Sequence, residues 1–121
     1  MTKRILVVED TEDNRQIVRD LLTSVGYEMI EAVDGAQGIE VALREKPDLI
    51  LMDIQLPVLD GYEATRRIKA DASTQHIPII AVTSYALSGD EEKARAAGCD
   101  DYLAKPFSPR QLLALVRARL A

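Results

Sequence analysis

The chain of 121 residues has few of the residues on which disulfide-rich or aromatic-rich proteins depend: one cysteine, one histidine, one phenylalanine and no tryptophan. Cys99 has no cysteine partner in the chain, which favours a reducing compartment and predicts a cytoplasmic location. We expect Cys99 to be a small buried residue and His76 to lie in a loop, neither with a chemical role. With so few aromatic residues, the core must be aliphatic.

Long apolar runs and an excess of basic residues are also missing. Runs such as Ile5–Val8 and Leu49–Met52 are far shorter than the ~20 residues that span a bilayer, so no membrane segment is expected. The net charge is -5, whereas nucleic acids are bound by clustered Lys and Arg. Direct nucleic-acid binding is therefore not expected. With 47% apolar residues, the chain has the composition of one folded domain.

Short apolar runs alternate with amphipathic stretches, a pattern typical of strand and helix units around a parallel sheet. Five strands are predicted, at 3–9, 27–32, 48–53, 77–82 and 99–103. The first, third and fourth are apolar on both faces, as central strands covered by helices must be. Charged residues interrupt the second and fifth, at Glu28, Glu31 and Asp101, which places these two strands nearer the edges.

Capping residues mark the predicted helix boundaries. Ser108, followed by proline and then Gln111, predicts the N-terminus of the last helix. Similar signals are expected to start helices at Asp60 and Ser88 and to end helices at Gly26 and Gly98. The helix predicted at 90–97 contains three alanines and no Leu, Ile or Val. It is therefore expected to be weakly anchored and able to shift.

Polar residues follow or end four of the predicted strands: Glu9, Asp10, Asp53, Thr83 and Lys105. The carboxyl ends of parallel strands lie at one edge of the sheet, where such folds bind ligands. Three carboxylates brought together there repel one another unless a cation offsets their charge. Oxygen ligands favour magnesium, whereas zinc prefers His or Cys. The sequence therefore predicts a magnesium site at this edge.

Most of these residues have an ordinary structural explanation when taken singly. Asp10 could cap a helix, Thr83 could satisfy backbone groups at a strand end, and Lys105 could be a surface lysine. Asp53 differs, because it follows an apolar run and an unpaired buried carboxylate is costly. The coincidence of all five positions at one edge favours a functional site.

Four motifs support a more specific interpretation: VVED at 7–10, LMDIQLP at 51–57, AVTS at 81–84 and KPF at 105–107. In this order and spacing, the chain resembles the receiver domains of bacterial two-component response regulators over essentially its whole length. It resembles single-domain regulators most, although receivers detached from hybrid histidine kinases are similar. The resemblance implies a flavodoxin-like α/β fold, a doubly wound five-stranded parallel sheet in the order 2-1-3-4-5, with one receiver domain over 1–121 and no output domain.

The resemblance also implies the chemistry. Asp53 would accept a phosphoryl group from a sensor histidine kinase or a phosphotransfer protein, and the domain would catalyse only its own phosphorylation and dephosphorylation. Mg2+, or Mn2+ in its place, would be held by Asp10, Asp53 and the backbone carbonyl of Gln55. Glu9, where aspartate is commoner in the family, would act through a bound water.

Further positions are assigned by the same resemblance. Lys105 and Thr83 would contact the phosphoryl group, and the Lys105–Pro106 peptide bond would be cis. Thr83 and Tyr102 would form a switch, with a downstream protein bound by the face of helix 4, strand 5 and helix 5. Ser84 and Tyr85 would flank the site.

Three other functions fit the sequence less well. A phosphatase of the haloacid-dehalogenase type would have a second acid two residues after Asp53, where this chain has Gln55. A flavin or nucleotide carrier would have a phosphate-binding loop after the first strand, where this chain is acidic. An interaction module without phosphorylation chemistry is the third alternative.

Overall fold

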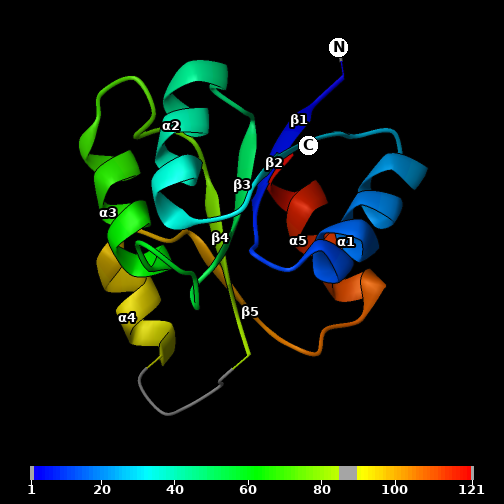
Figure 1. The fold of residues 1–121 in the computed structure, drawn as a ribbon. Helices are drawn as coiled ribbons and strands as arrows, with labels where there is room; N and C mark the ends of the chain where they lie inside the picture. The colour runs from blue at the N-terminus through cyan, green and yellow to red at the C-terminus, as the bar shows by residue number, and fades with distance from the viewer. Residues whose placement is uncertain (1, 85–89, 121) are drawn as a thin grey trace.

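The structure is a computed structural model that describes residues 2–84 and 90–120. Within these residues, five strands and five helices alternate (Figure 1). The elements are β1 (Arg4–Val8), α1 (Glu12–Ser24), β2 (Glu28–Ala32), α2 (Gly35–Glu45), β3 (Leu49–Asp53), α3 (Gly61–Ala70), β4 (Ile79–Thr83), α4 (Asp90–Ala97), β5 (Asp101–Ala104) and α5 (Pro109–Leu120). None of the described helices is long and apolar enough to cross a membrane.

The strands form one parallel sheet in the order β2-β1-β3-β4-β5. This order confirms the predicted fold and places the two mixed strands, β2 and β5, at the edges. The predicted strands begin one or two residues early. Thr83 is the last residue of β4 rather than the residue after it.

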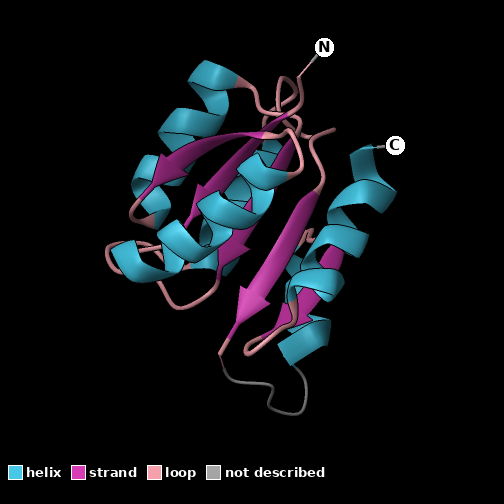
Figure 2. Ribbon diagram, turned by 90° about the vertical axis from the view of Figure 1, so that its right-hand side faces the viewer, coloured by secondary structure: helices cyan, strands magenta, loops and turns pink. Residues whose placement is uncertain are grey.

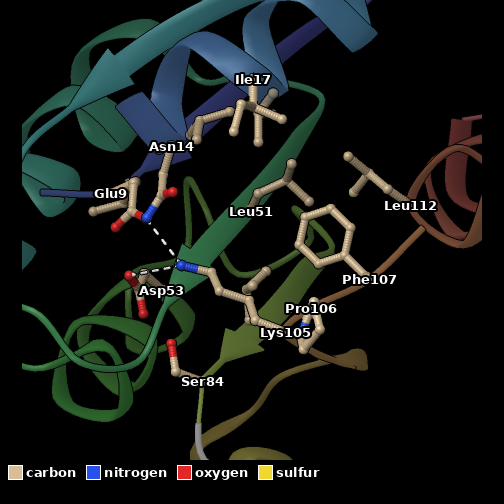
Figure 3. A pocket seen from close by; sticks show the side chains of 14 residues that line it. Glu9, Asn14, Ile17, Leu51, Asp53, Ser84, Lys105, Pro106, Phe107 and Leu112 are labelled. Atoms are coloured by element: carbon tan, nitrogen blue, oxygen red, sulfur yellow. Dashed lines mark hydrogen bonds and ion pairs between the residues drawn. The ribbon is translucent and has the colours of Figure 1, made fainter. Parts of the chain in front are cut away.

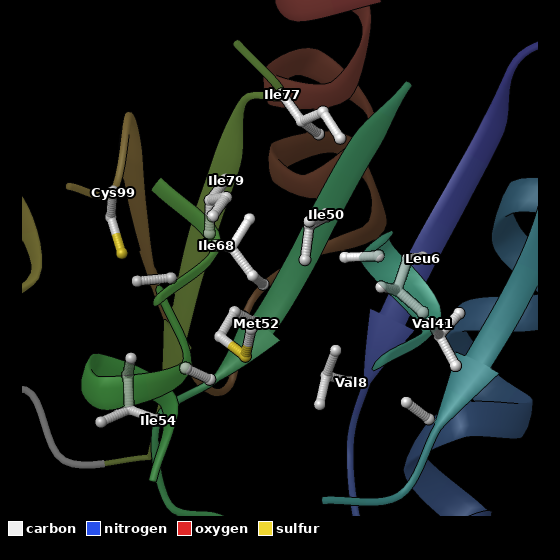
Figure 4. Packing of buried hydrophobic residues seen from close by; sticks show 14 of the residues in the cluster. Leu6, Val8, Val41, Ile50, Met52, Ile54, Ile68, Ile77, Ile79 and Cys99 are labelled. Atoms are coloured by element: carbon white, nitrogen blue, oxygen red, sulfur yellow. The ribbon is translucent and has the colours of Figure 1, made fainter. Parts of the chain in front are cut away.

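Helices cover both faces of the sheet, with α1 and α5 on one side and α2, α3 and α4 on the other (Figures 1 and 2). Alternate residues of each central strand therefore enter different cores. Leu6 and Ile50 pack beneath α2 and α3 (Figure 4), whereas Ile5 and Leu49 pack beneath α1 and α5. Burial on both faces explains why these strands are continuously apolar.

The predicted caps can be followed in the hydrogen bonds. Gln111 N donates to Ser108 Oγ at 3.1 Å and Ser108 N donates to Gln111 Oε1 at 2.9 Å, a reciprocal capping box. The Asp60 carboxylate accepts from Glu63 N at 2.9 Å. Gly26 and Gly98 follow helices with φ of +93° and +110°, a conformation that favours glycine. Ser88 and Tyr85 lie outside the described residues.

The loop after β3 packs tightly against the start of two helices. A Cβ atom added at Gly61 would lie 2.2 Å from the carbonyl oxygen of Asp53, and one added at Gly35 would lie 1.9 Å from that of Leu59. Both distances are shorter than atoms can approach, so these positions require glycine. The backbone of Asp53 is thereby held against the first turn of α3.

We expect Gly61→Ala to destabilise the protein by about 1 to 3 kcal/mol, because the new methyl group must displace backbone at Asp53. Urea unfolding of the metal-free protein measures the change. Ala96→Gly, at an exposed position of α4, is the control and should cost only about 1 kcal/mol through helix propensity. Equal stability of Gly61→Ala and wild type would contradict this close contact between Gly61 and Asp53.

Candidate functional site

The fold brings the predicted polar residues to one edge of the sheet (Figure 3). Glu9 and Asp10 follow β1, Asp53 and Thr83 end β3 and β4, and Lys105 follows β5. One carboxylate oxygen from each of Glu9, Asp10 and Asp53 lies within 4.8 Å of the other two. Asp10 is exposed, whereas Glu9 and Asp53 are buried, at 5% and 7% exposure. The carboxylates are thus crowded and only partly hydrated.

Glu9 is the most heavily bonded of the three acids. Its carboxylate accepts hydrogen bonds from Asn14 Nδ2 at 2.7 Å, Lys105 Nζ at 2.9 Å and the backbone N–H of Asp10 at 2.9 Å. Burial by itself would raise the pKa of Glu9, but hydrogen bonding with Asp53, Lys105 and Asn14 lowers it to about 2. Glu9 is therefore ionised at neutral pH.

The pKa of Asp53 is shifted in the opposite direction to that of Glu9. Burial, together with the hydrogen bond to Glu9 and the charge of Glu9, raises the pKa of Asp53 to about 7. Lys105 and the Gln55 N–H, which donates to Asp53 Oδ1 at 3.1 Å, pull the pKa down without cancelling this effect. Without a bound cation, Asp53 is therefore partly protonated at neutral pH.

Lys105 brings a positively charged side chain to the three acids. Its side chain reaches back across the sheet edge, with Nζ 2.9 Å from Glu9 and 3.5 Å from Asp53 (Figure 3). Burial would lower the pKa of Lys105, but the hydrogen bond to Glu9 and the charges of Asp53 and Glu9 raise it. The Lys105–Pro106 peptide bond is cis.

Gln55 joins the acidic site to the end of β4. Its side-chain Nε2 donates to Thr83 Oγ1 at 3.0 Å, and its Oε1 accepts from Ser84 N at 3.2 Å. Thr83 is fully buried. Sequence reasoning assigned a role to the carbonyl of Gln55 but missed this side-chain bridge, because nothing in the sequence indicates its rotamer.

Two residues of α1 were also missed. Asn14 holds Glu9, as described above, and Arg15 Nη1 donates to the Glu9 carbonyl oxygen at 2.7 Å. Arg15 is buried at 9% exposure. The run of polar residues at the start of α1 resembles an ordinary solvated surface, and only the orientation of the helix reveals which two face the site.

The donor set fits a hard divalent cation. Three carboxylates converge, all offering oxygen, and Asp10 leaves one side open to water. Asp10 follows β1, Asp53 ends β3 and Gln55 lies in the loop after β3. The two carboxylates and the Gln55 carbonyl would hold Mg2+, which keeps several water ligands.

A cavity of about 490 Å³ adjoins the acids and is lined mainly by apolar side chains. Its lining includes Ile17 of α1, Leu51 of β3, Phe107 just before α5 and Leu112 of α5 (Figure 3). Ile17 is 58% exposed although it is apolar. Asp53 therefore borders a cavity whose wall is largely apolar.

The remaining candidates lie away from the acids. Tyr102 on β5 is partly buried against the core beneath α2, α3 and α4. Cys99 is buried, and burial is the main cause that raises the pKa of its thiol. His76 is exposed in the turn between α3 and β4. The expected positions of Cys99 and His76 are confirmed.

Comparison with known proteins gives one consistent family. Residues 5–117 match the model of the response regulator receiver domain. The chain is 44% identical over 120 residues to the polar-differentiation response regulator DivK of Brucella ovis, covering 99% of this chain and 98% of that protein.

Solved structures of a receiver domain and of a response regulator have the same fold as this chain. The receiver domain of a sensor histidine kinase from Pseudomonas aeruginosa superposes with a TM-score of 0.92 at 43% identity, covering 99% of this chain and 98% of that one. That structure has a magnesium ion coordinated in the active site cleft. The chemotaxis response regulator CheY4 of Vibrio cholerae has a TM-score of 0.92 at 28% identity, covering 98% of this chain and 99% of that one.

We expect Asp53→Asn to stabilise the metal-free protein at pH 8 by about 1 to 3 kcal/mol. Asp53 has its pKa raised from 3.8 to about 7 by folding, so the folded state binds the extra proton and loses stability as pH rises from 4 to 7. Asparagine removes this penalty. The gain should therefore shrink towards pH 4. Urea unfolding with EDTA at pH 5 and pH 8 measures it, and an equal or lower stability of the variant at pH 8 would contradict the raised pKa.

Proposed function

Because the chain belongs to the response regulator receiver domain family, we propose that it accepts a phosphoryl group on Asp53 from a sensor histidine kinase or a phosphotransfer protein. The observation that carries this proposal is the placement of Asp53. It is a buried carboxylate at the end of a central strand, with Glu9 and Asp10 on one side and Lys105 on the other. The domain would act as a signalling protein in a bacterial cytoplasm.

The proposed reaction is a phosphoryl transfer between two proteins. A carboxylate oxygen of Asp53 attacks phosphorus, the phosphorus–nitrogen bond of the donor phosphohistidine breaks, and its electron pair returns to the imidazole. Asp53 must be ionised to attack. Mg2+, or Mn2+, held by Asp10, Asp53 and the Gln55 carbonyl, with Glu9 acting through water, would supply charge that favours the ionised form and neutralises phosphoryl oxygens.

Lys105 and Thr83 complete the proposed site. Lys105 already lies 3.5 Å from Asp53 Oδ2, so a small movement would bring its ammonium to a phosphoryl oxygen. The Thr83 hydroxyl would donate a hydrogen bond to another phosphoryl oxygen. The apolar cavity beside Ile17 and Phe107 would admit the donor.

The proposed switch begins at Thr83. Its hydroxyl oxygen accepts from Gln55 Nε2 at 3.0 Å, and the hydroxyl would donate its proton to the phosphoryl group. Tyr102 would then move inward as the end of β4 shifts. A downstream protein would read the face formed by α4, β5 and α5. In this proposal the output is a protein contact made by the receiver domain, without direct binding of nucleic acid or membrane.

Incubation with acetyl phosphate and Mg2+ tests the chemistry. We expect the intact mass to rise by one phosphoryl group in the wild type, because Asp53 is the reactive carboxylate. Asp53→Asn should show no gain, and EDTA should abolish it. Glu40→Gln is a control on an exposed carboxylate of α2 away from the cluster and should be phosphorylated. Phosphorylation of Asp53→Asn would refute the assignment.

Hydrogen exchange tests the switch separately. Phosphorylation of the wild type should alter amide exchange in residues 90–104, since α4 and β5 are expected to rearrange. Thr83→Ala should still gain a phosphoryl group but show less than half of this change, because it cannot donate the hydroxyl. If both proteins change equally, Thr83 does not carry the signal.

A further inference from the structure

Arg15 is a buried cation at the start of α1 that bonds the backbone of the acidic loop. Its Nη1 donates to the carbonyl oxygen of Glu9 at 2.7 Å, and its Nε donates to Glu31 Oε1 on β2 at 3.0 Å. Its remaining nitrogen, Nη2, pairs with Glu12. The guanidinium thus links β2, α1 and the end of β1.

The peptide unit between Glu9 and Asp10 is held at both ends. Its carbonyl accepts from Arg15, and its N–H donates to the Glu9 carboxylate at 2.9 Å. This peptide carries two of the three crowded acids. Because like charges repel, a loop without this restraint would relax by moving its acids away from Asp53. The hydrogen bond from Arg15 opposes that movement.

We propose that Arg15 is a positioning residue that sets the Mg2+ affinity of the acidic site by holding the Glu9–Asp10 peptide, with Glu31 anchoring it to β2. This inference rests on the proposed function, which places Mg2+ at these acids. Arg15 itself touches the carbonyl of Glu9 and not the cation.

The sign of the effect separates this role from simple electrostatics. Removing a positive charge near a cation site should by itself tighten Mg2+ binding. Releasing the Glu9–Asp10 peptide should weaken it. A merely structural role would lower thermal stability without weakening the affinity. Weaker binding after loss of a positive charge is therefore the signature of positioning.

Arg19 offers a matched control one helical turn further along α1. It pairs with the same two carboxylates, Glu12 and Glu31. Arg19→Gln removes the same charge and the same ion-pair partners as Arg15→Gln, but leaves the hydrogen bond to the Glu9 carbonyl in place.

The test is calorimetric titration with Mg2+ at constant pH and ionic strength, with thermal unfolding in EDTA measured for each variant. We expect Arg15→Gln to raise the dissociation constant roughly 10-fold and Arg19→Gln to change it less than about 2-fold, as two exposed ion pairs require. Arg15→Lys keeps the charge but not the forked contacts, and should weaken binding by roughly 3-fold.

Unchanged or tighter binding by Arg15→Gln would overturn the inference, as would equal weakening by Arg19→Gln. If Arg15→Gln does not fold, Arg15→Lys decides, and wild-type affinity in it overturns the inference. Wild-type protein that binds no Mg2+ would overturn the proposed function as well. Binding that depends on Asp53 but not on Arg15 would overturn the inference alone.

Discussion

Repulsion among three carboxylates at one sheet edge is the constraint to which the rest of the site responds. Glu9, Asp10 and Asp53 lie within 4.8 Å of one another, and two of them are buried. The chain offsets this charge with Lys105 from the far end of the sequence, and with a raised pKa at Asp53. Such an arrangement is costly without a cation and would become favourable with one bound, as the proposed function requires.

Neighbouring backbone and side chains hold the three carboxylates close together. The backbone of Asp53 lies against Gly61 so closely that no side chain fits there, and Asp53 itself ends a strand buried on both faces. On the other side, Asn14 and Arg15 bond Glu9 through its carboxylate and its carbonyl. The acids are therefore held by packing from β3 and by hydrogen bonds from α1. Burial, together with the hydrogen bond to Glu9 and the charge of Glu9, raises the pKa of Asp53.

The fold and the acidic residues could be predicted from sequence for one physical reason. Strands buried on both faces are continuously apolar, and parallel strands put their carboxyl ends together, so polar residues after such runs must meet. The hydrogen bonds of Asn14, Arg15 and Gln55 could not be predicted, because they depend on helix rotation and rotamers. A polar residue at the start of α1 has the same sequence pattern whether it faces solvent or Glu9.

The same packing argument bears on where a signal would travel. Among the described residues, α4 buries only alanines, Ala94 and Ala97, whereas each of the other helices buries at least one larger aliphatic side chain: Leu22, Val41, Ile68, Leu112 and Val116. Each buried methylene group contributes about 0.8 kcal/mol, so α4 is the helix that moves at least cost. It follows β4, whose last residue Thr83 is bonded to Gln55. In the proposed switch, a change at Asp53 would therefore pass through Thr83 at the end of β4 to the weakly anchored helix α4.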